Sequence, residues 1–535
     1  MKFKSTLYSL TAATMLLGGA TACTHDFEEI NKDPNKMLVG ELQPYGMFEE
    51  LFYGMARQQT NYTYAWNDEL AQITANTGLA SQNVHRYLII DTNWSSFWNN
   101  YAKYGANAVH MYQLADKYDD DACRAVALTI KAYLLSNLTD LFGDIPYTEA
   151  FRNSEGIMTP VFDSQKDVYE GLLSDLEKAN RLYAKKPEFA KPTMDIMYYG
   201  DMSLWRKFNN SLYLRLLMRV SGRDLDLRVS ERIRTVVENP GQYPLISSNA
   251  ESAMVHNTGV DPYYNFFRPI NKDKSSFTTS SYHITQNFIN LTLLAAGADT
   301  EEDPRLAIWA QPASESYGWK GTVAGCHPTD QKVVDEGTSR LNYEILVQDN
   351  APAYLLDYSE VEFCLAEAAL KGMIDGGEEA ARTHYERAVT ASCNKWGQLD
   401  YLPSDVVDNN RNITQEDIDK LLSGKLAGWD QNENKEELIG NQKYLSLFWV
   451  GFEAFHELRR TSYPRVIIGP GTAFNDYELP QRMGYPSTTM GTNAANAKAA
   501  LDRQGGDNTM KTPVWWSYKA INGSFPTSEL SYKPN

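Results

Sequence analysis

The stretch over residues 123–138, CRAVALTIKAYLLSNL, places the strongest constraint on the fold. Val126, Ile130 and Leu134 recur every four positions, as they would on one face of an α-helix, and Leu128 adds an apolar side chain on the other side. A helix that is apolar on nearly all faces is stable only inside a core. The sequence therefore predicts a large helical core built around this segment.

The sequence that follows this helix, DLFGDIPYTEAF, ends it at a sharp corner. Gly143 tolerates the left-handed backbone that terminates a helix, and Pro146 cannot continue one. We expect the corner to be structural and to join one helix pair to the next. Its Asp140 and Asp144 are expected to act as helix caps rather than as ligands for a bound molecule.

Other stretches repeat the helical pattern. SQKDVYEGLLSDLEKANRLY begins with a cap at Ser164, and WRKFNNSLYLRLLMRVSG ends in glycine. SEVEFCLAEAALKG and EEAARTHYERAVTAS form a predicted helical hairpin with Ala381, Tyr385 and Val389 facing inward. Such hairpins are typical of tetratricopeptide repeats, although the strict 34-residue pattern is absent. We expect a mainly α fold whose helical frame covers about 40–240 and 350–464.

Two long regions, 241–349 and 465–535, break the helical pattern and are rich in Tyr, Phe, Pro, Gly, Ser and Asn. Long loops within a compact chain usually carry function. The sequence therefore predicts that helices build the frame and that these loop-rich regions, with few short strands, form the binding surface. Residues 23–535 are expected to fold as a single domain.

The first residues have the pattern of a secretory signal peptide. Lys2 and Lys4 precede an apolar stretch over residues 7–22, and the small residues GGATA stand directly before Cys23. This pattern resembles the lipobox of bacterial lipoproteins, in which the cysteine is lipidated and becomes the new N-terminus. Ala20 stands where leucine is commoner, so an ordinary cleavage site with an incidental Cys23 is the alternative.

Charge and cysteine usage exclude several classes of function. The formal net charge is -18, with 68 acidic against 50 basic residues, which argues against a nucleic-acid partner. The four cysteines after Cys23 are too widely spaced for a disulfide framework. We expect Cys123, Cys364 and Cys393 to be buried free thiols, whereas Cys326, in the loop AGCHPTD, could instead reach a ligand.

Motifs of enzymes and metal sites are scarce. HELRR at His456 begins like the zinc motif HExxH but has Arg460 in place of the second histidine. No GxSxG or GxxxxGK[ST] motif occurs, and GPGTAF at Gly469 lacks the third glycine of a dinucleotide fingerprint. We therefore expect no catalytic residues, no metal site and no cofactor.

Aromatic residues are abundant, with 33 Tyr, 20 Phe and 11 Trp. A flat ring with a free face can lie against the C–H face of a sugar while neighbouring polar groups meet its hydroxyls. The candidates for this role are Trp66 beside Asp68 in YAWND, Trp94 in TNWSSFW and Trp319 in YGWKG. Each can equally be a packing residue, and Trp94 lies on an apparent helix that could bury it.

Several segments resemble one known family, the SusD/RagB nutrient-binding lipoproteins of Bacteroidetes-type bacteria. DLFGDIPYTEAF is similar to the central signature of this family, and EEINKDPN follows the lipidated cysteine as in many members. YLLDYSEVEFCLAEAALKG and GFEAFHELRRTSYP are similar to its helices. The tail, from LPQRMGYP to QGGDNTMKTPVWW, resembles the branch called SusD-like group two.

The resemblance implies a fold with four tetratricopeptide-like helix pairs and long loops that carry the binding surface. It implies no catalysis. A lipoprotein of this kind is anchored to the outer membrane through Cys23, faces the cell exterior and acts as the lid of a TonB-dependent transporter of the SusC type. The acidic Asp26, Glu28 and Glu29 resemble the signal that sends such lipoproteins to the cell surface.

The ligand does not follow from the resemblance, because family members take starch, fructan, other glycans or peptides. An oligosaccharide is the leading expectation. A peptide receptor of the RagB kind is the alternative, for which Arg268 or Arg305 near the aromatic loops would suit peptide charges, unless these arginines are structural. A hydrolase at the cell surface is the third hypothesis, from another functional class.

Overall fold

The computed structural model describes residues 42–76, 83–267, 282–296, 299–313, 318–327, 337–402 and 412–534. The predicted signal peptide, Cys23 and the acidic residues after it lie outside the described residues, as does Arg268. All statements about the structure concern the described ranges.

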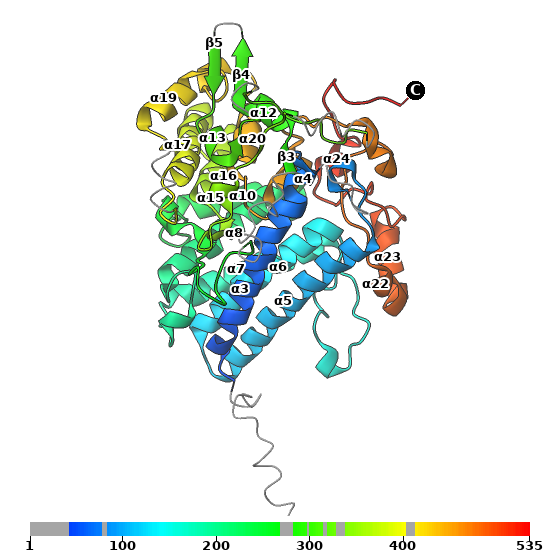
Figure 1. Ribbon diagram of the computed structural model, residues 1–535. Coiled ribbons are helices and arrows are strands. Elements are labelled where there is room, and N and C mark those ends of the chain that lie inside the picture. The colour runs from blue at the N-terminus through cyan, green and yellow to red at the C-terminus, as the bar shows by residue number, and fades with distance from the viewer. Residues whose placement is uncertain are drawn as a thin grey trace, which may run out of the picture.

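Consecutive helices pack against one another and build most of the molecule (Figure 1). Four pairs carry the frame: α5 with α6, α7 with α8, α16 with α17, and α20 with α21. This arrangement confirms the predicted mainly α fold. The bounds are α3 (Phe48–Tyr62), α4 (Asp68–Leu70), α5 (Asp91–Lys117), α6 (Asp121–Phe142), α7 (Gln165–Ala184), α8 (Met202–Arg219), α9 (Asp224–Leu227), α10 (Val229–Glu238), α16 (Tyr358–Leu370), α17 (Gly377–Gly397), α19 (Gln415–Ser423), α20 (Lys435–Ser446) and α21 (Glu453–Thr461).

The central helix α6 lies inside the core, as its sequence predicts. Val126, Ile130 and Leu134 are buried, and so is nearly every other residue of the helix. Asp120 caps its N-terminus by accepting a hydrogen bond from the backbone N–H of Cys123 at 2.9 Å. The α16–α17 hairpin likewise buries the small and aromatic residues that the sequence places inward: Ala381, Tyr385, Ala388 and Val389.

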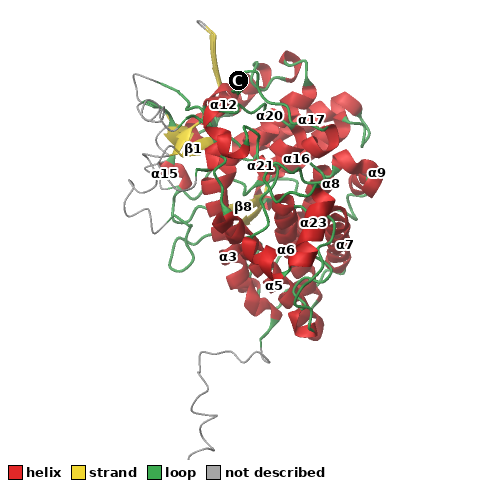
Figure 2. Cartoon of the chain, turned by 90° about the vertical axis from the view of Figure 1, so that its right-hand side faces the viewer, coloured by secondary structure: helices red, strands yellow, loops and turns green. Residues whose placement is uncertain are grey.

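The strands are few and short, and they form three small antiparallel sheets (Figure 2). A four-stranded sheet has the order β1-β3-β7-β6, in which Ala75 lies opposite His283 and His283 opposite Arg340. β2 pairs with β8, and β4 pairs with β5 in a hairpin that projects from one end of the molecule in Figure 1. The bounds are β1 (Thr74–Asn76), β2 (Ala253–Val255), β3 (Tyr282–Ile284), β4 (Leu293–Ala296), β5 (Asp299–Glu302), β6 (Ala310–Gln311), β7 (Arg340–Leu341) and β8 (Ala353–Leu356).

The two loop-rich regions differ from each other. Region 241–349 supplies most strands together with the short helices α12 (Gln286–Thr292), α13 (Leu306–Trp309) and α15 (Tyr343–Leu346). Region 465–534 instead packs into the helical frame, because Met483, Tyr485 and Trp516 are buried. Met483 N–H also donates to the carbonyl of Leu141 at 2.6 Å. This tail contains α22 (Ser487–Thr492), α23 (Ala494–Gln504) and α24 (Tyr518–Asn522).

The corner after α6 is built as a junction between helices. Gly143 adopts a φ of +81°, which favours glycine, and its carbonyl accepts from the Thr139 hydroxyl at 2.6 Å. Asp144 accepts from the backbone N–H of Gln165 at 2.9 Å and so caps the start of α7. The predicted capping role is therefore confirmed for Asp144. It is wrong for Asp140, which lies within α6 and binds other side chains.

Candidate functional site

Trp66 is not a loop residue with a free face, and that part of its prediction is wrong. It lies in a π-helical segment, η2 (Thr63–Asn67), which continues α3 without a break into α4. Its side chain is 7% exposed and packs edge-to-face on Phe97, with ring centroids 4.7 Å apart. YAWND contains no glycine or proline to end the helix, which is why the segment stays helical.

Asp68 is also a core residue rather than an accessible polar group. It is fully buried, and its Oδ1 accepts a hydrogen bond from the Asn67 amide at 3.0 Å. The Asn67 side chain in turn accepts from the backbone N–H of Phe455 at 3.0 Å. Burial raises the pKa of Asp68 well above its ordinary value. A ligand at the surface does not reach this carboxyl group.

Trp94 lies in the first turn of α5 and is half-buried. Its ring covers Gly484, where a Cβ atom would come within 2.6 Å of the ring. Beside it, the Ser487 hydroxyl donates to Asp91 at 2.9 Å and joins α5 to the C-terminal region. Trp94 therefore packs between α5 and the C-terminal segment around Gly484. Its role in ligand binding stays a prediction.

Trp319 keeps the partly exposed setting that a sugar-binding ring needs. Its indole Nε1–H donates to the Glu302 carboxylate on β5 at 3.0 Å, and one side of the ring packs against the core. Since the N–H is already engaged, the ring can offer a ligand its apolar face rather than a hydrogen bond. Burial raises the pKa of Glu302, which the indole hydrogen bond partly offsets.

Two hydrogen bonds hold the backbone at Lys320 and Gly321, directly after Trp319. Ser339 N–H donates to the carbonyl of Lys320 at 2.7 Å, and Gly321 N–H donates to the Gln286 side chain at 3.2 Å. A Cβ atom at Gly321 would lie 2.3 Å from the backbone of Gln286, so only glycine fits here. We call Gln286, Glu302, Trp319 and Lys320 the Trp319 rim. Sequence reasoning missed Glu302, because only the fold brings it beside a residue 17 positions away.

The remaining predicted candidates are structural. Cys326 is buried, and its carbonyl accepts from Arg86 Nε at 2.7 Å. Arg305 is fully buried and forms an ion pair with Asp303 at 2.6 Å, so it does not offer its charge to a peptide. The other three cysteines, Cys123, Cys364 and Cys393, are buried free thiols, as predicted.

The three candidate tryptophans do not form one aromatic cluster. Among the ring pairs of the described residues, none joins two of Trp66, Trp94 and Trp319.

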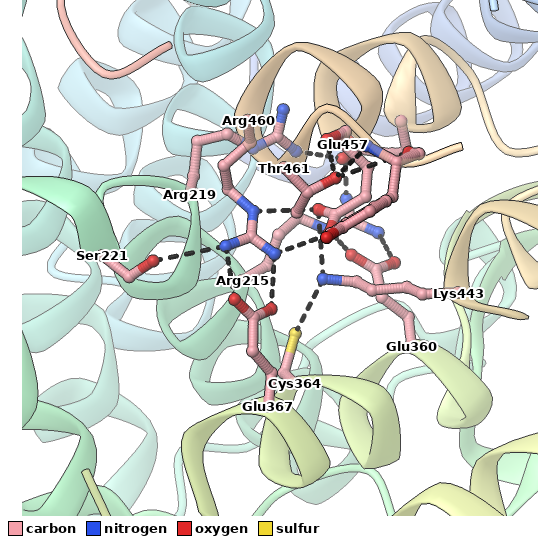
Figure 3. A network of polar contacts seen from close by, with 12 residues as sticks. Arg215, Arg219, Ser221, Glu360, Cys364, Glu367, Lys443, Glu457, Arg460 and Thr461 are labelled. Atoms are coloured by element: carbon pink, nitrogen blue, oxygen red, sulfur yellow. Dashed lines mark hydrogen bonds and ion pairs between the residues drawn. The ribbon is translucent and has the colours of Figure 1, made fainter. Parts of the chain in front are cut away.

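A network of buried charges links the helices that carry the resemblance (Figure 3). Arg215 of α8 donates through Nε to Glu360 of α16 at 2.6 Å and through Nη1 to Glu453 of α21 at 3.3 Å. Arg219, one turn further along α8, pairs with Glu453 and lies 3.4 Å from Asp140 of α6. Four helices are thereby joined through side chains that are each less than a tenth exposed.

The second half of the network centres on Arg460. Its guanidinium donates to Glu367 at 2.8 Å and to Glu457 at 2.5 Å, while Lys443 of α20 reaches Glu457 at 3.2 Å. Burial alone would raise the pKa of Glu457, but Arg460 and Lys443 outweigh it and hold that pKa at about 2. The residue that breaks the zinc motif is therefore an ion-pair partner in the core.

The buried members of the network are equal in number of positive and negative charges. The five carboxylates are Asp140, Glu360, Glu367, Glu453 and Glu457, and the five cations are Arg215, Arg219, Lys443, Arg459 and Arg460. Lys371, which is more exposed, also pairs with Glu367 at 2.7 Å. Arg459 has no carboxylate partner among the described residues and donates instead to the carbonyls of Asp140 and Gln481. The resemblance segments thus mark the frame of the molecule rather than a binding surface.

Two features that the described residues lack bear on function. No group of three or more His, Cys, Asp or Glu side chains within the described ranges is arranged to hold a metal ion. In the same ranges, none of the helices combines the length and the apolar character needed to cross a membrane.

Comparison with known proteins identifies the relatives of this chain. A family model, SusD-like_2, described as starch-binding associating with outer membrane, matches residues 34–486. No curated protein sequence gives a significant match.

Solved structures share the fold. A SusD homologue from Bacteroides fragilis superimposes with a TM-score of 0.73 at 23% identity, covering 89% of this chain and 100% of that one. One from Parabacteroides distasonis gives 0.74 at 21% identity, covering 92% and 100%. A chitin-binding SusD homologue from Flavobacterium johnsoniae gives 0.69 at 20% identity, covering 88% and 98%.

Proposed function

We propose that this chain, which belongs to the SusD-like family, captures an oligosaccharide at the bacterial cell surface as a nutrient-binding lipoprotein. The family is described as starch-binding and associated with the outer membrane, and the match over residues 34–486 is the observation that carries the proposal. The frame of buried ion pairs supports a binding role, since it supplies a rigid support for the residues around it.

The Trp319 rim is the proposed contact with the sugar. The indole is fixed by its hydrogen bond to Glu302 and stays partly exposed, and the polar residues Lys320 and Gln286 lie beside it. An aromatic face flanked by hydrogen-bonding groups on an anchored loop is the arrangement that sugar recognition needs. No catalysis is proposed for this site.

The proposed anchor is Cys23, lipidated after removal of residues 1–22. A single acyl chain binds a membrane only marginally, whereas several chains hold a protein stably. Cys23→Ala should therefore release soluble protein from the outer-membrane fraction. Unchanged fractionation of this variant would contradict the anchor.

The proposed partner is a TonB-dependent transporter of the SusC type, over which this protein closes as a lid. Its surface-exposed position would place captured sugar at the mouth of the transporter. Affinity purification of the membrane-bound protein should recover a large barrel protein in stoichiometric amount, and recovery of the lipoprotein alone would contradict the partnership.

Calorimetric titration with maltohexaose, chitohexaose and an uncharged hexapeptide tests the ligand class. Trp319→Ala should weaken binding of the sugar by about 1–3 kcal/mol, the effect of losing one aromatic anchor. Trp98→Phe, a change in the packed part of α5, is the control. Binding of the peptide alone would favour the RagB-type alternative. Release of shortened sugars with turnover would favour the hydrolase.

A further inference from the structure

The structure contains a groove on another part of the molecule, along the outer face of α17. Two adjoining cavities form it, with volumes of about 540 and 420 Å³. Asn249 and Asn394 line both cavities, so the two lie next to each other. Volumes of this size are those of small-molecule sites in proteins. We propose that this α17 groove is a second carbohydrate-binding site, which takes an uncharged glycan chain.

One wall of the groove is a single face of α17. Thr383, Arg387, Thr390 and Asn394 follow one another at steps of three or four residues, and Gln398 continues the row just beyond the helix. This spacing keeps all five side chains on one side. At 1.5 Å per residue the row is roughly 22 Å long, which suits an extended chain rather than a compact ligand.

The opposite wall is the segment 247–257, and hydrogen bonds hold it against the helices. The Asn249 amide donates to the carbonyl of Ala391 on α17 at 2.9 Å, at the point where the two cavities meet. The Asn257 amide donates to the carbonyl of Ala351 at 2.7 Å, and the Ser252 hydroxyl accepts from Tyr358 N–H at 3.1 Å. These hydrogen bonds fix the position of segment 247–257 opposite α17, so both walls of the groove are held in place.

The chemistry of the lining is mainly that of neutral hydrogen-bonding groups. The side chains of Asn350, Asn394 and Gln398 have no hydrogen-bond partner among the described residues, so their amides are open to a ligand. Two of the four Lys, Arg, Asp and Glu side chains that line the groove are paired: Lys395 with Asp357 at 2.6 Å and Glu386 with Arg382 at 2.7 Å. The other two, Arg387 in the first cavity and Asp400 in the second, are exposed and opposite in sign, so the lining carries no excess of one charge. Amides that both donate and accept suit the hydroxyl groups of an uncharged sugar chain better than a phosphate or a strongly charged peptide.

Each cavity also contains a partly exposed aromatic ring. Tyr358 lines the first cavity and Tyr401 the second. A third ring, Tyr354, has Lys395 Nζ 3.8 Å from its centroid, so one of its faces is occupied. Two rings, one at each part of a polar groove, provide the apolar surface against which the C–H faces of sugars pack.

The α17 groove shares no lining residue with the Trp319 rim. The inference rests on the proposed function, because the groove is assigned the same class of ligand. Two sites on one chain would let a long glycan bind at two points, which raises overall affinity without any new contact at either.

The test is calorimetric titration of the full mature chain with maltohexaose and with chitohexaose. Asn394→Trp fills the point shared by the two cavities, and the milder double variant Asn394→Ala with Gln398→Ala removes two amides. Glu379→Ala is the matched control, since this exposed residue lies on the same helix but does not line the groove. Melting curves establish that each variant is folded.

For one of the two sugars, we expect two equivalents to bind per wild-type chain. Asn394→Trp and Trp319→Ala should each bind one equivalent of the same sugar. The double alanine variant should weaken the groove site at least tenfold, and Glu379→Ala should leave both sites unchanged. One equivalent in the wild type, lost in Trp319→Ala and unaffected in Asn394→Trp, would overturn the groove while the proposed function stands. Absence of sugar binding in every form would overturn both. A hexapeptide that binds the wild type but not Asn394→Trp would make the groove a peptide site and overturn its assignment to a glycan.

Discussion

Two regions of this molecule bury acidic side chains completely, and they do so in opposite ways. In the helical network, Glu367 and Glu457 meet the guanidinium of Arg460 and stay ionised. In the short helix α4, Asp68 and Glu69 are equally buried but form no ion pair within the described part of the chain. Burial raises the pKa of Glu69 to about 8, although the backbone N–H groups of Asn76 and His85 donate to it.

The difference shows that a buried carboxyl group in this protein has two structural uses. In the network, paired charges join helices that are far apart in sequence. In α4, the Glu69 carboxyl group accepts backbone hydrogen bonds and holds the segment around His85. Burial and Arg86 lower the pKa of His85 itself to about 3. Neither use is a binding function, which explains why acidic residues in the sequence point to no site.

The largest expected effect comes from cutting the network in two. Residues 23–240 contain Arg215 and Arg219 but none of their partners on α16 and α21. An isolated fragment of this span should expose apolar surface and aggregate, because Arg215 loses both of its carboxylate partners and Arg219 keeps only Asp140. Light scattering and thermal melting measure this. A soluble fragment that melts cooperatively would show that the chain divides into separable domains.

Breaking one pair should have the next largest effect. Glu367→Ala removes one of the two carboxylates that pair with Arg460 and should lower the free energy of unfolding by about 3–5 kcal/mol, since Glu457 alone then faces the two buried cations Arg460 and Lys443. Denaturant titration measures the loss. Asp502→Ala, in the exposed pair with Lys498, is the control and should change stability little. Equal effects of the two changes would contradict the role of the buried pair.

In the helical segment that joins α3 to α4, Trp66→Ala tests whether the region is part of the core. Loss of the ring from its place against Phe97 should reduce the free energy of unfolding by about 3 kcal/mol. Binding of a sugar to the folded variant should not change. If Trp66→Ala kept its stability but bound sugar more weakly, Trp66 would be a ligand-binding residue, and its assignment to the core would be wrong.

The smallest expected effect is on the pH dependence of the free energy of unfolding, to which Glu69 and Glu457 contribute with opposite signs. Because the folded pKa of Glu69 lies above the ordinary 4.5, its protonated form is favoured in the fold, and stability is lost as pH rises from 4.5 to about 8. Glu457, with a folded pKa of about 2, has the opposite sign: its contribution is lost as pH falls from 4.5 towards 2.

Glu69→Gln should therefore remove part of the stability loss between pH 5 and 8, a change of about 1–2 kcal/mol. Denaturant titrations of both proteins across this range measure it. Glu457→Gln should instead lower the free energy of unfolding at neutral pH. In this variant the free energy of unfolding should also fall less steeply as the pH drops from 4.5 towards 2. Parallel stability curves for wild type and Glu69→Gln would mean that Glu69 is ionised in the folded protein.

Local features of the chain could be predicted well. The four-residue spacing of Val126, Ile130 and Leu134 determined a buried helix, and the acceptor side chain of Ser164 determined where α7 begins. The inward residues of the α16–α17 hairpin followed from their spacing for the same reason. These features depend on neighbours within one or two helical turns, so the sequence alone contains the information.

Only the tertiary structure decided which of these pieces meet. Trp66 is buried because Phe97 covers it, and Trp319 is held because Glu302, at the end of β5, lies beside it. Arg460 is an ion-pair partner because α16 brings Glu367 to it from 93 positions away. The polar face of α17 becomes a groove only once segment 247–257 packs against it. Periodicity shows that a helix has two faces, but burial, charge pairing and cavities depend on which distant face lies opposite, and no local pattern records that.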